Sequence, residues 1–131
     1  MHSICQGIDL TSVKRLELVM RRGGPAFIQR VFAAAEHRYC RSKRRKYEHY
    51  AARFAAKEAV IKALKIPKGK TLGMREIEVR HHATGKPYVR LAPAARKRLR
   101  LPSKMQIEIS LSHEREYAIA AVLITGIRGK R

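Results

Sequence analysis

Two acidic residues and one lysine in this sequence stand in apolar surroundings, where charged side chains need partners. Asp9 lies near the end of the apolar segment 4–10, and Glu58 and Lys62 lie in the alanine-rich segment 50–64. A carboxylate that is removed from water stays charged only if a cation, a metal ion or hydrogen bonds lie beside it. These three residues are therefore the first candidates for a metal-binding or ligand-binding site.

The segment that carries Glu58 and Lys62 is predicted to be a helix. It is rich in Ala, Lys, Arg and Glu and contains neither Gly nor Pro, which is the composition of a strong helix former. At about 100° per residue, the side chains that share the face of Glu58 are Tyr47, Ala51, Phe54, Ala55, Ile61 and Lys62. One alternative is that Lys62 is simply the ion-pair partner of Glu58 at the edge of the core and that neither residue has a further role, since such pairs four residues apart are common on helices. Asp9, likewise, can simply cap or turn the chain before the helix that follows it.

Size and charge restrict the class of protein. The chain has 131 residues, enough for one domain, and an apolar fraction of 45% argues against disorder. Its 30 Lys plus Arg against 10 Asp plus Glu give a net charge of +20, so its surface should attract polyanions such as nucleic acid, phosphate-rich ligands, anionic lipid or an acidic protein.

The cysteines and the apolar runs indicate the compartment. Cys5 and Cys40 have no spacing typical of zinc or redox sites, so we expect free thiols in a reducing cytoplasm. No secretory signal is visible at the start. The longest uncharged apolar run, residues 117–127, is too short to span a bilayer. We expect a soluble, cytoplasmic protein with no membrane partner.

The order of predicted elements indicates an α+β domain. A short buried strand over residues 4–10 is followed by a helix, which Thr11 or Ser12 can cap and which Gly23-Gly24-Pro25 ends. A second short helix and the basic run 38–46 lead into the central helix, which residues 65–69 break. The later predicted elements are strands at 76–79 and 88–91 joined by a turn at 83–87, a short helix at 93–100, a half-buried strand at 105–112 and a more fully buried strand at 117–124.

Four separated segments resemble one family. Gly7-Ile8-Asp9-Leu10, Arg53-Phe-Ala-Ala-Lys57-Glu58-Ala59 with Lys62, Gly85-Lys86-Pro87 and Ser110-Leu-Ser112-His113 follow each other in the order and spacing of the holo-[acyl-carrier-protein] synthases, which are 4'-phosphopantetheinyl transferases. The resemblance covers nearly the whole chain. It implies a single transferase domain over residues 1–131, in which a long central helix packs on a small antiparallel sheet, and a homotrimer with active sites between subunits.

The resemblance also implies a reaction in fatty acid biosynthesis. The 4'-phosphopantetheine group of coenzyme A is transferred to a serine of apo acyl carrier protein in the presence of Mg²⁺, and adenosine 3',5'-bisphosphate is released. By match to the family motifs, Asp9 and Glu58 are the metal ligands, and Asp9, Glu58 and Lys62 are the catalytic residues. The residues implied to bind coenzyme A are Arg53, Lys57, Lys62, Gly85, Lys86, Pro87, Ser112 and His113.

The carrier protein is implied to bind the helix that follows Asp9. Acyl carrier proteins are acidic, so the basic side chains on and after this helix should attract them, less strongly as salt rises. The candidates are Lys14, Arg15, Arg21, Arg22 and Arg30. The base that accepts the proton of the carrier serine stays open between Glu58, a water or hydroxide on the metal, and Glu36, which aligns with a family acid.

The sequence departs from the family in two places. Cys5 replaces the first glycine of the usual Gly-x-Gly-x-Asp, and Ala33 and Ala34 replace a Thr and a Pro ahead of Glu36. These changes make the role of Glu36 doubtful, but they do not touch the two metal ligands.

Two other hypotheses account for part of the sequence. A small basic nucleic-acid-binding protein would suit the size and the run 38–46. Aromatic residues for stacking are sparse, at 6%, and this hypothesis gives Asp9 and Glu58 no purpose, so we do not expect nucleic acid as a partner, although charge alone leaves it open. The third possibility is a relative that has lost activity and serves as a binding subunit.

Overall fold

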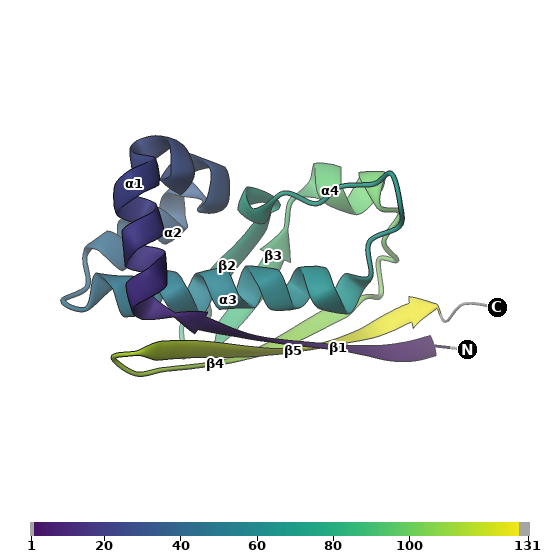
Figure 1. The fold of residues 1–131 in the computed structure, drawn as a ribbon. Coiled ribbons are helices and arrows are strands. Elements are labelled where there is room, and N and C mark those ends of the chain that lie inside the picture. The colour runs from purple at the N-terminus through teal and green to yellow at the C-terminus, as the bar shows by residue number, and fades with distance from the viewer. Residues whose placement is uncertain (1, 129–131) are drawn as a thin grey trace.

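The computed structural model describes residues 2–128, which form a three-stranded antiparallel sheet with a long helix packed along one face (Figure 1). The sheet has the order β1-β5-β4, with β1 at His2–Ser12, β5 at Tyr117–Arg128 and β4 at Gln106–His113. The long helix is α3, Lys46–Leu64. It starts four residues before the predicted helix and ends at the predicted residue, and the α+β class and the antiparallel sheet are confirmed.

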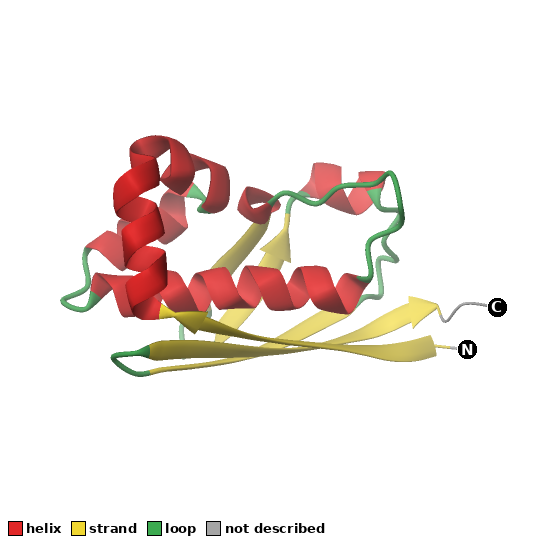
Figure 2. Cartoon of the chain, in the orientation of Figure 1, coloured by secondary structure: helices red, strands yellow, loops and turns green. Residues whose placement is uncertain are grey.

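The remaining elements lie around α3 (Figure 2). A second sheet pairs β2, Ile77–His81, with β3, Pro87–Leu91, in the predicted antiparallel hairpin. Two helices, α1 at Val13–Val31 and α2 at Ala34–Arg41, lie near the start of α3, while α4 at Pro93–Arg98 lies near its end. A short 3-10 helix, η1 at Met74–Glu76, precedes β2.

Small residues allow α3 to lie very close to the sheet. The face of α3 that meets the sheet is made largely of alanines, among them the fully buried Ala55, Ala59 and Ala63. On β1, a side-chain carbon added at Gly7 would stand 2.0 Å from the carbonyl oxygen of Ala59. Only glycine at position 7 permits this backbone contact, which fixes the distance between β1 and α3.

Helix α1 begins as predicted and ends later. The Ser12 hydroxyl accepts a hydrogen bond from the backbone N–H of Arg15 at 3.2 Å and so caps the helix. At Gly24 the backbone turns to φ 58°, and the helix continues beyond this kink to Val31. The predicted end at Gly23-Gly24-Pro25 is therefore a bend, because the two flanking helical segments follow each other without a loop.

The two long strands are less buried than predicted. Residues of β1 and β5 alternate between a face against α3 and an open face, and the open face carries large apolar side chains: Ile4, Ile8, Leu10, Tyr117, Ile119 and Leu123. Ile8 and Leu10 are 60% and 61% exposed. The predictions of a buried strand at 4–10 and of a more fully buried strand at 117–124 are wrong for the single chain, because α3 covers only one face of the sheet.

The structure also bears on two further predictions, which concern the cysteines and membrane-spanning segments. Cys5 and Cys40 are both free thiols, as predicted. No helix within residues 2–128 combines the length and the apolar character needed to cross a membrane.

The end of α3 offers a stabilising substitution. Lys65 closes the helix with φ 49° and ψ 62°, in the left-handed region that costs a residue with a side chain about 1–2 kcal/mol and glycine almost nothing. We expect Lys65→Gly to raise the free energy of unfolding by about 1 kcal/mol, which urea titration would measure. Lys68→Gly, in the loop that follows, is the matched control, and an equal gain there would contradict this explanation.

Candidate active site

Asp9 and Glu58 line one pocket. The pocket has a volume of about 350 Å³ and lies between β1, α1 and α3, and its lining residues are Asp9, Leu10, Thr11, Ser12, Arg15, Leu16, Val19, Phe27, Phe54 and Glu58. The two acids are 49 positions apart in the sequence. The fold thus brings together the pair that the sequence suggested as metal ligands.

The close contact between β1 and α3 brings the segments that carry the two acids to the same pocket. Asp9 lies two residues after Gly7, so both point to the same face of the strand, and Glu58 lies next to Ala59 on the helix. The hydroxyl of Thr11, two residues further along the same face, donates to Asp9 Oδ2 at 3.1 Å. Thr11 was predicted only as a possible helix cap. Its spacing of two residues from Asp9, which puts both side chains on one face of the strand, was the signal for this contact.

Lys62 pairs with Asp9 and not with Glu58. Its ammonium donates to Asp9 Oδ1 at 2.9 Å and to the carbonyl oxygen of Ile8 at 3.2 Å. The hydrogen bond and the charge of Asp9 raise the pKa of Lys62, and the charge of Glu58 adds to this effect. Within residues 2–128, Glu58 itself has no hydrogen-bond or ion-pair partner, so its carboxylate is free to bind a cation.

The donor set suits a divalent cation that is held in part by a substrate. No group of three or more His, Cys, Asp or Glu residues in the described part of the chain forms a metal site. Two carboxylates from different elements line the pocket, and Lys62, which is ion-paired to Asp9, supplies one positive charge beside them. Mg²⁺ is usually held by one or two carboxylates, with substrate phosphates and waters completing its coordination, and Asp9 and Glu58 fit this pattern.

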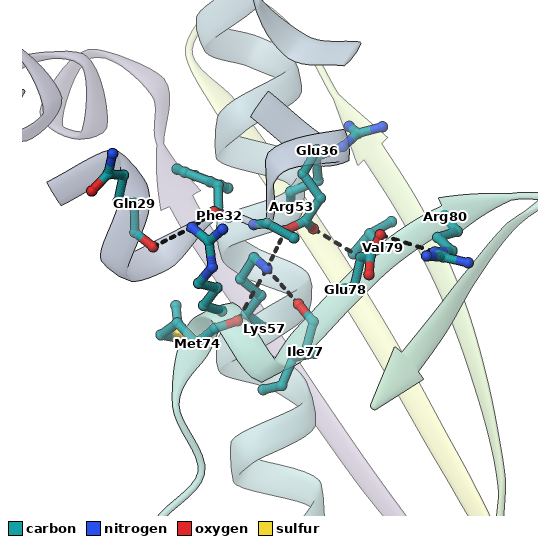
Figure 3. Close-up of polar contacts among 12 residues, drawn as sticks. Gln29, Phe32, Glu36, Arg53, Lys57, Met74, Ile77, Glu78, Val79 and Arg80 are labelled. Carbon is teal, nitrogen blue, oxygen red and sulfur yellow. Dashed lines mark hydrogen bonds and ion pairs between the residues drawn. The ribbon is translucent and has the colours of Figure 1, made fainter. Parts of the chain in front are cut away.

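Lys57, which was predicted to bind coenzyme A, lies inside the protein. Its side chain is 0% exposed, and its ammonium lies 2.6 Å from Glu36 Oε1 and also donates to the carbonyl oxygens of Met74 and Ile77 (Figure 3). Burial lowers the pKa of Lys57, although Glu36 opposes the effect. The predicted contact of Lys57 with coenzyme A is not supported, because no part of the side chain reaches the surface.

Arg53, also on α3 and also predicted to bind coenzyme A, is buried as well. It is 3% exposed, its guanidinium lies 4.3 Å from the centre of the Tyr39 ring, and one of its nitrogens donates to the carbonyl oxygen of His49 at 3.2 Å. Among residues 2–128, its Nε has no hydrogen-bond partner. A second guanidinium nitrogen lies 3.5 Å from His81 Nε2, so Arg53 offers almost no surface to coenzyme A in the single chain.

The other residues assigned to coenzyme A lie away from the pocket of Asp9. Gly85, Lys86 and Pro87 form or follow the turn between β2 and β3, where Gly85 has φ 90°. Lys86 lies 3.3 Å from Glu108 Oε2 and lines a second pocket of about 530 Å³ over the sheet. Within one chain the predicted coenzyme A residues thus lie in separate places.

Ser112 and His113 lie at the end of β4. Ser112 is exposed and has Ile119 of β5 opposite it. His113 Nδ1 lies 2.9 Å from Glu48 Oε1, and its ring lies 4.9 Å from that of His49. Glu48 and His49 were not predicted as neighbours of His113, because these contacts join residues 65 and 64 positions apart.

The basic candidates for carrier binding are exposed along α1. Lys14, Arg15, Arg21 and Arg22 are all exposed, as is Arg30 beyond the kink. Arg21 pairs with Glu17 at 3.0 Å, and Arg15 lines the pocket of Asp9 and Glu58. Leu18 and Val19 are exposed beside them. A basic face with apolar side chains therefore borders the candidate active site.

Three histidines, on α2, α3 and β2, predict a loss of stability in acid. Burial lowers the pKa of His37, His49 and His81, and the charges of Arg41, His113 and Arg53 respectively add to the effect. As pH falls through the usual range of histidine, the unfolded chain takes up more protons than the folded chain, so stability falls. We expect a lower melting temperature at pH 5.5 than at pH 7.5. His49→Phe should reduce the difference between the two melting temperatures. Equal melting temperatures of the original chain at pH 5.5 and pH 7.5 would contradict the prediction.

Comparison with known proteins identifies the family. The family model for the 4'-phosphopantetheinyl transferase superfamily matches residues 6–122. The holo-[acyl-carrier-protein] synthase of Ruminiclostridium cellulolyticum is 42% identical over 91% of this chain and 90% of that protein. The one of Thermodesulfovibrio yellowstonii is 43% identical over 91% of this chain and 96% of that protein.

The fold is also that of solved structures of this type. The crystal structure of the Helicobacter pylori holo-[acyl-carrier-protein] synthase in complex with coenzyme A matches with a TM-score of 0.77 and 28% identity, and covers 91% of this chain and 98% of that one. The Neisseria meningitidis enzyme matches with a TM-score of 0.81 and 30% identity, over 92% of this chain and 96% of that one. The chain therefore belongs to the 4'-phosphopantetheinyl transferase superfamily and, within it, to the holo-[acyl-carrier-protein] synthases.

Proposed function

We propose that this chain binds coenzyme A at the pocket of Asp9 and Glu58 and transfers its 4'-phosphopantetheine group to a serine of an apo acyl carrier protein. The observation that carries the proposal is that Asp9 and Glu58 line one pocket and that Lys62 is ion-paired to Asp9, in a chain of this enzyme family. Coenzyme A is the ligand in the Helicobacter pylori structure. The roles given below to individual residues of this chain are part of our proposal.

Asp9 and Glu58 would together hold one Mg²⁺. When bound, the ion would neutralise charge on the diphosphate of coenzyme A. Charge stabilisation of this kind, with positioning, is the main contribution of a protein to phosphoryl transfer. Lys62 would bind a phosphate oxygen, since its ammonium already stands beside Asp9. Thr11 would keep the Asp9 carboxylate oriented through its hydroxyl.

In the reaction, a bond forms between the serine oxygen and the β-phosphorus as the bond from that phosphorus to the departing adenosine 3',5'-bisphosphate breaks. The serine proton must pass to a base. Glu36 does not suit this role, because it is 1% exposed and its oxygens accept from Lys57, Ala33 and Val79. Glu58 or a water at the pocket remains as the base.

The carrier protein would approach along α1. The exposed Lys14, Arg15, Arg21 and Arg22 offer positive charge to an acidic partner, and Arg15 borders the pocket where the serine would react. Complementary charge speeds association and orients the partner. Arg30, beyond the kink in α1, would add to the same attraction.

We also propose that the active enzyme is a homotrimer that works in the cytoplasm. The open face of the sheet carries exposed Ile4, Ile8, Leu10, Ile119 and Leu123, and such apolar patches usually mark an interface. A neighbouring subunit on this face would also bring a second set of coenzyme A residues toward each pocket. Two free thiols are in keeping with a reducing compartment.

The assembly can be tested by measuring molar mass in solution. We expect the original chain to have the mass of three chains by light scattering, and Ile8→Glu to have a lower mass and little transferase activity. Leu18→Glu, at another exposed apolar position, on α1, is the control for the added charge and should leave the mass unchanged. A monomeric original chain with full activity would contradict the trimer.

The transfer itself can be tested with purified components. The chain is incubated with coenzyme A, Mg²⁺ and an apo acyl carrier protein, and the carrier is weighed by mass spectrometry. We expect the mass to rise by one phosphopantetheine group, and no rise when a chelator is added. Tight RNA binding without transfer to any carrier tested would instead favour the nucleic-acid hypothesis, and coenzyme A binding without transfer would favour an inactive relative.

A further inference from the structure

The buried pair of Lys57 and Glu36 has no role in the reaction as described so far. Both side chains are 0% exposed, and they come from α3 and α2, 21 positions apart in sequence (Figure 3). Every donor of the ammonium is used, on Glu36 Oε1 and on the carbonyl oxygens of Met74 and Ile77. The pair therefore joins two helices to the start of β2.

The carboxylate of Glu36 is equally well satisfied. Oε1 accepts the backbone N–H of Ala33 at 2.9 Å as well as the ammonium of Lys57, and Oε2 accepts the backbone N–H of Val79 at 2.9 Å. These directional bonds hold α2, α3 and β2 in one arrangement. A fully satisfied network of this kind specifies geometry more than it adds stability, since apolar residues of the same volume often stabilise a core as well.

Apart from this network, little fixes the rotation of α3 about its own axis. Its face against the sheet is largely alanine, and a uniform surface of small side chains packs in several orientations with similar energy. Gly7 fixes how near β1 comes to the helix, but closeness alone does not fix the rotation of the helix about its own axis. The directional bonds of Lys57 supply that constraint.

Glu58 is the next residue along α3, and neighbouring helical side chains project about 100° apart. With Lys57 held toward α2 and β2, Glu58 is turned toward β1 and the pocket that it shares with Asp9. We infer that Lys57 and Glu36 form a positioning pair, which sets the rotation of α3 so that the Glu58 carboxylate faces Asp9. The inference rests on the proposed role of Glu58 as a metal ligand.

The test removes the pair without leaving a charge buried. In the double variant Glu36→Leu/Lys57→Met, apolar side chains of similar size fill the same space, and such replacements often keep a protein folded. Binding of Mn²⁺ in the presence of coenzyme A is measured by electron paramagnetic resonance. We expect the Mn²⁺ dissociation constant to rise about 10-fold, as for other residues that support metal ligands. At saturating metal, the KM for coenzyme A should change less than twofold.

The matched control separates positioning from general loss of stability. Val60→Ala truncates another buried side chain of α3 and should lower the melting temperature without changing the Mn²⁺ constant. If the double variant does not fold, Glu36→Gln keeps the shape of the side chain and removes its charge, and the same Mn²⁺ titration is made on it. An unchanged Mn²⁺ constant in the folded variant overturns the inference and leaves the proposed function intact. Absence of Mn²⁺ binding in the original chain overturns both.

Discussion

Glu58→Gln is expected to lower the rate of phosphopantetheine transfer by about 10²–10³-fold or more, the loss typical of removing one group that stabilises developing charge. The amide keeps the size of the side chain but cannot offer a charged oxygen to a cation. Because Glu58 has no partner within residues 2–128 and is half-buried at the pocket, the melting temperature should change little. Initial rates of carrier modification by mass spectrometry measure the effect.

Asp9→Asn should show the same loss of rate, with an added change at Lys62. The ammonium loses the charge of its partner at 2.9 Å, so the raised pKa of Lys62 should move back toward its usual value. Glu114→Gln, in the exposed turn between β4 and β5, is the control and should keep full activity. Transfer by either pocket variant at more than a tenth of the original rate would exclude the assigned metal ligands.

Gly7→Ala is the second substitution with a large expected effect. The new methyl group would stand 2.0 Å from the Ala59 carbonyl oxygen, so β1 must move away from α3. Overpacking of this kind typically costs about 1–3 kcal/mol of stability. The same movement would separate Asp9 from Glu58, so transfer should fall by about 10²-fold or more even where the variant is fully folded.

A second crowded glycine provides the comparison. A methyl group at Gly126 would stand 2.6 Å from the Lys104 carbonyl oxygen, at a φ of 81°, and far along β5 from Ala120, which pairs with Asp9. We expect Gly126→Ala to lose at least as much stability in urea titration but to keep its transfer rate at a temperature where it is folded. Equal losses of activity in the two variants would show that stability, and not the spacing of the two acids, explains the result.

The helix and strand pattern was predictable because it depends on local composition. The alanine-rich central segment, the hairpin at Gly85 and the alternation along β4 each carry their own signal, and all three are found in the structure. The pairing of Asp9 with Glu58 at one pocket was reached only through the family motifs. Nothing local in either segment indicates that they meet.

The errors have physical causes as well. The resemblance assigned Lys57 to coenzyme A, whereas its burial depends on a carboxylate 21 positions away that the sequence does not link to it. The strands β1 and β5 are apolar on both faces, and the sequence cannot distinguish a face covered by the chain's own helix from one that another subunit would cover. Ile8 and Leu10 were therefore assigned to the core.

The account depends most on Asp9 and Glu58 holding one cation together with the diphosphate of coenzyme A. The direct test is titration of Mn²⁺ by electron paramagnetic resonance, with and without coenzyme A, on the original chain, Asp9→Asn and Glu58→Gln. We predict one Mn²⁺ per chain that binds more tightly when coenzyme A is present, and at least tenfold weaker binding in each variant. Unchanged Mn²⁺ binding in both variants would contradict the account.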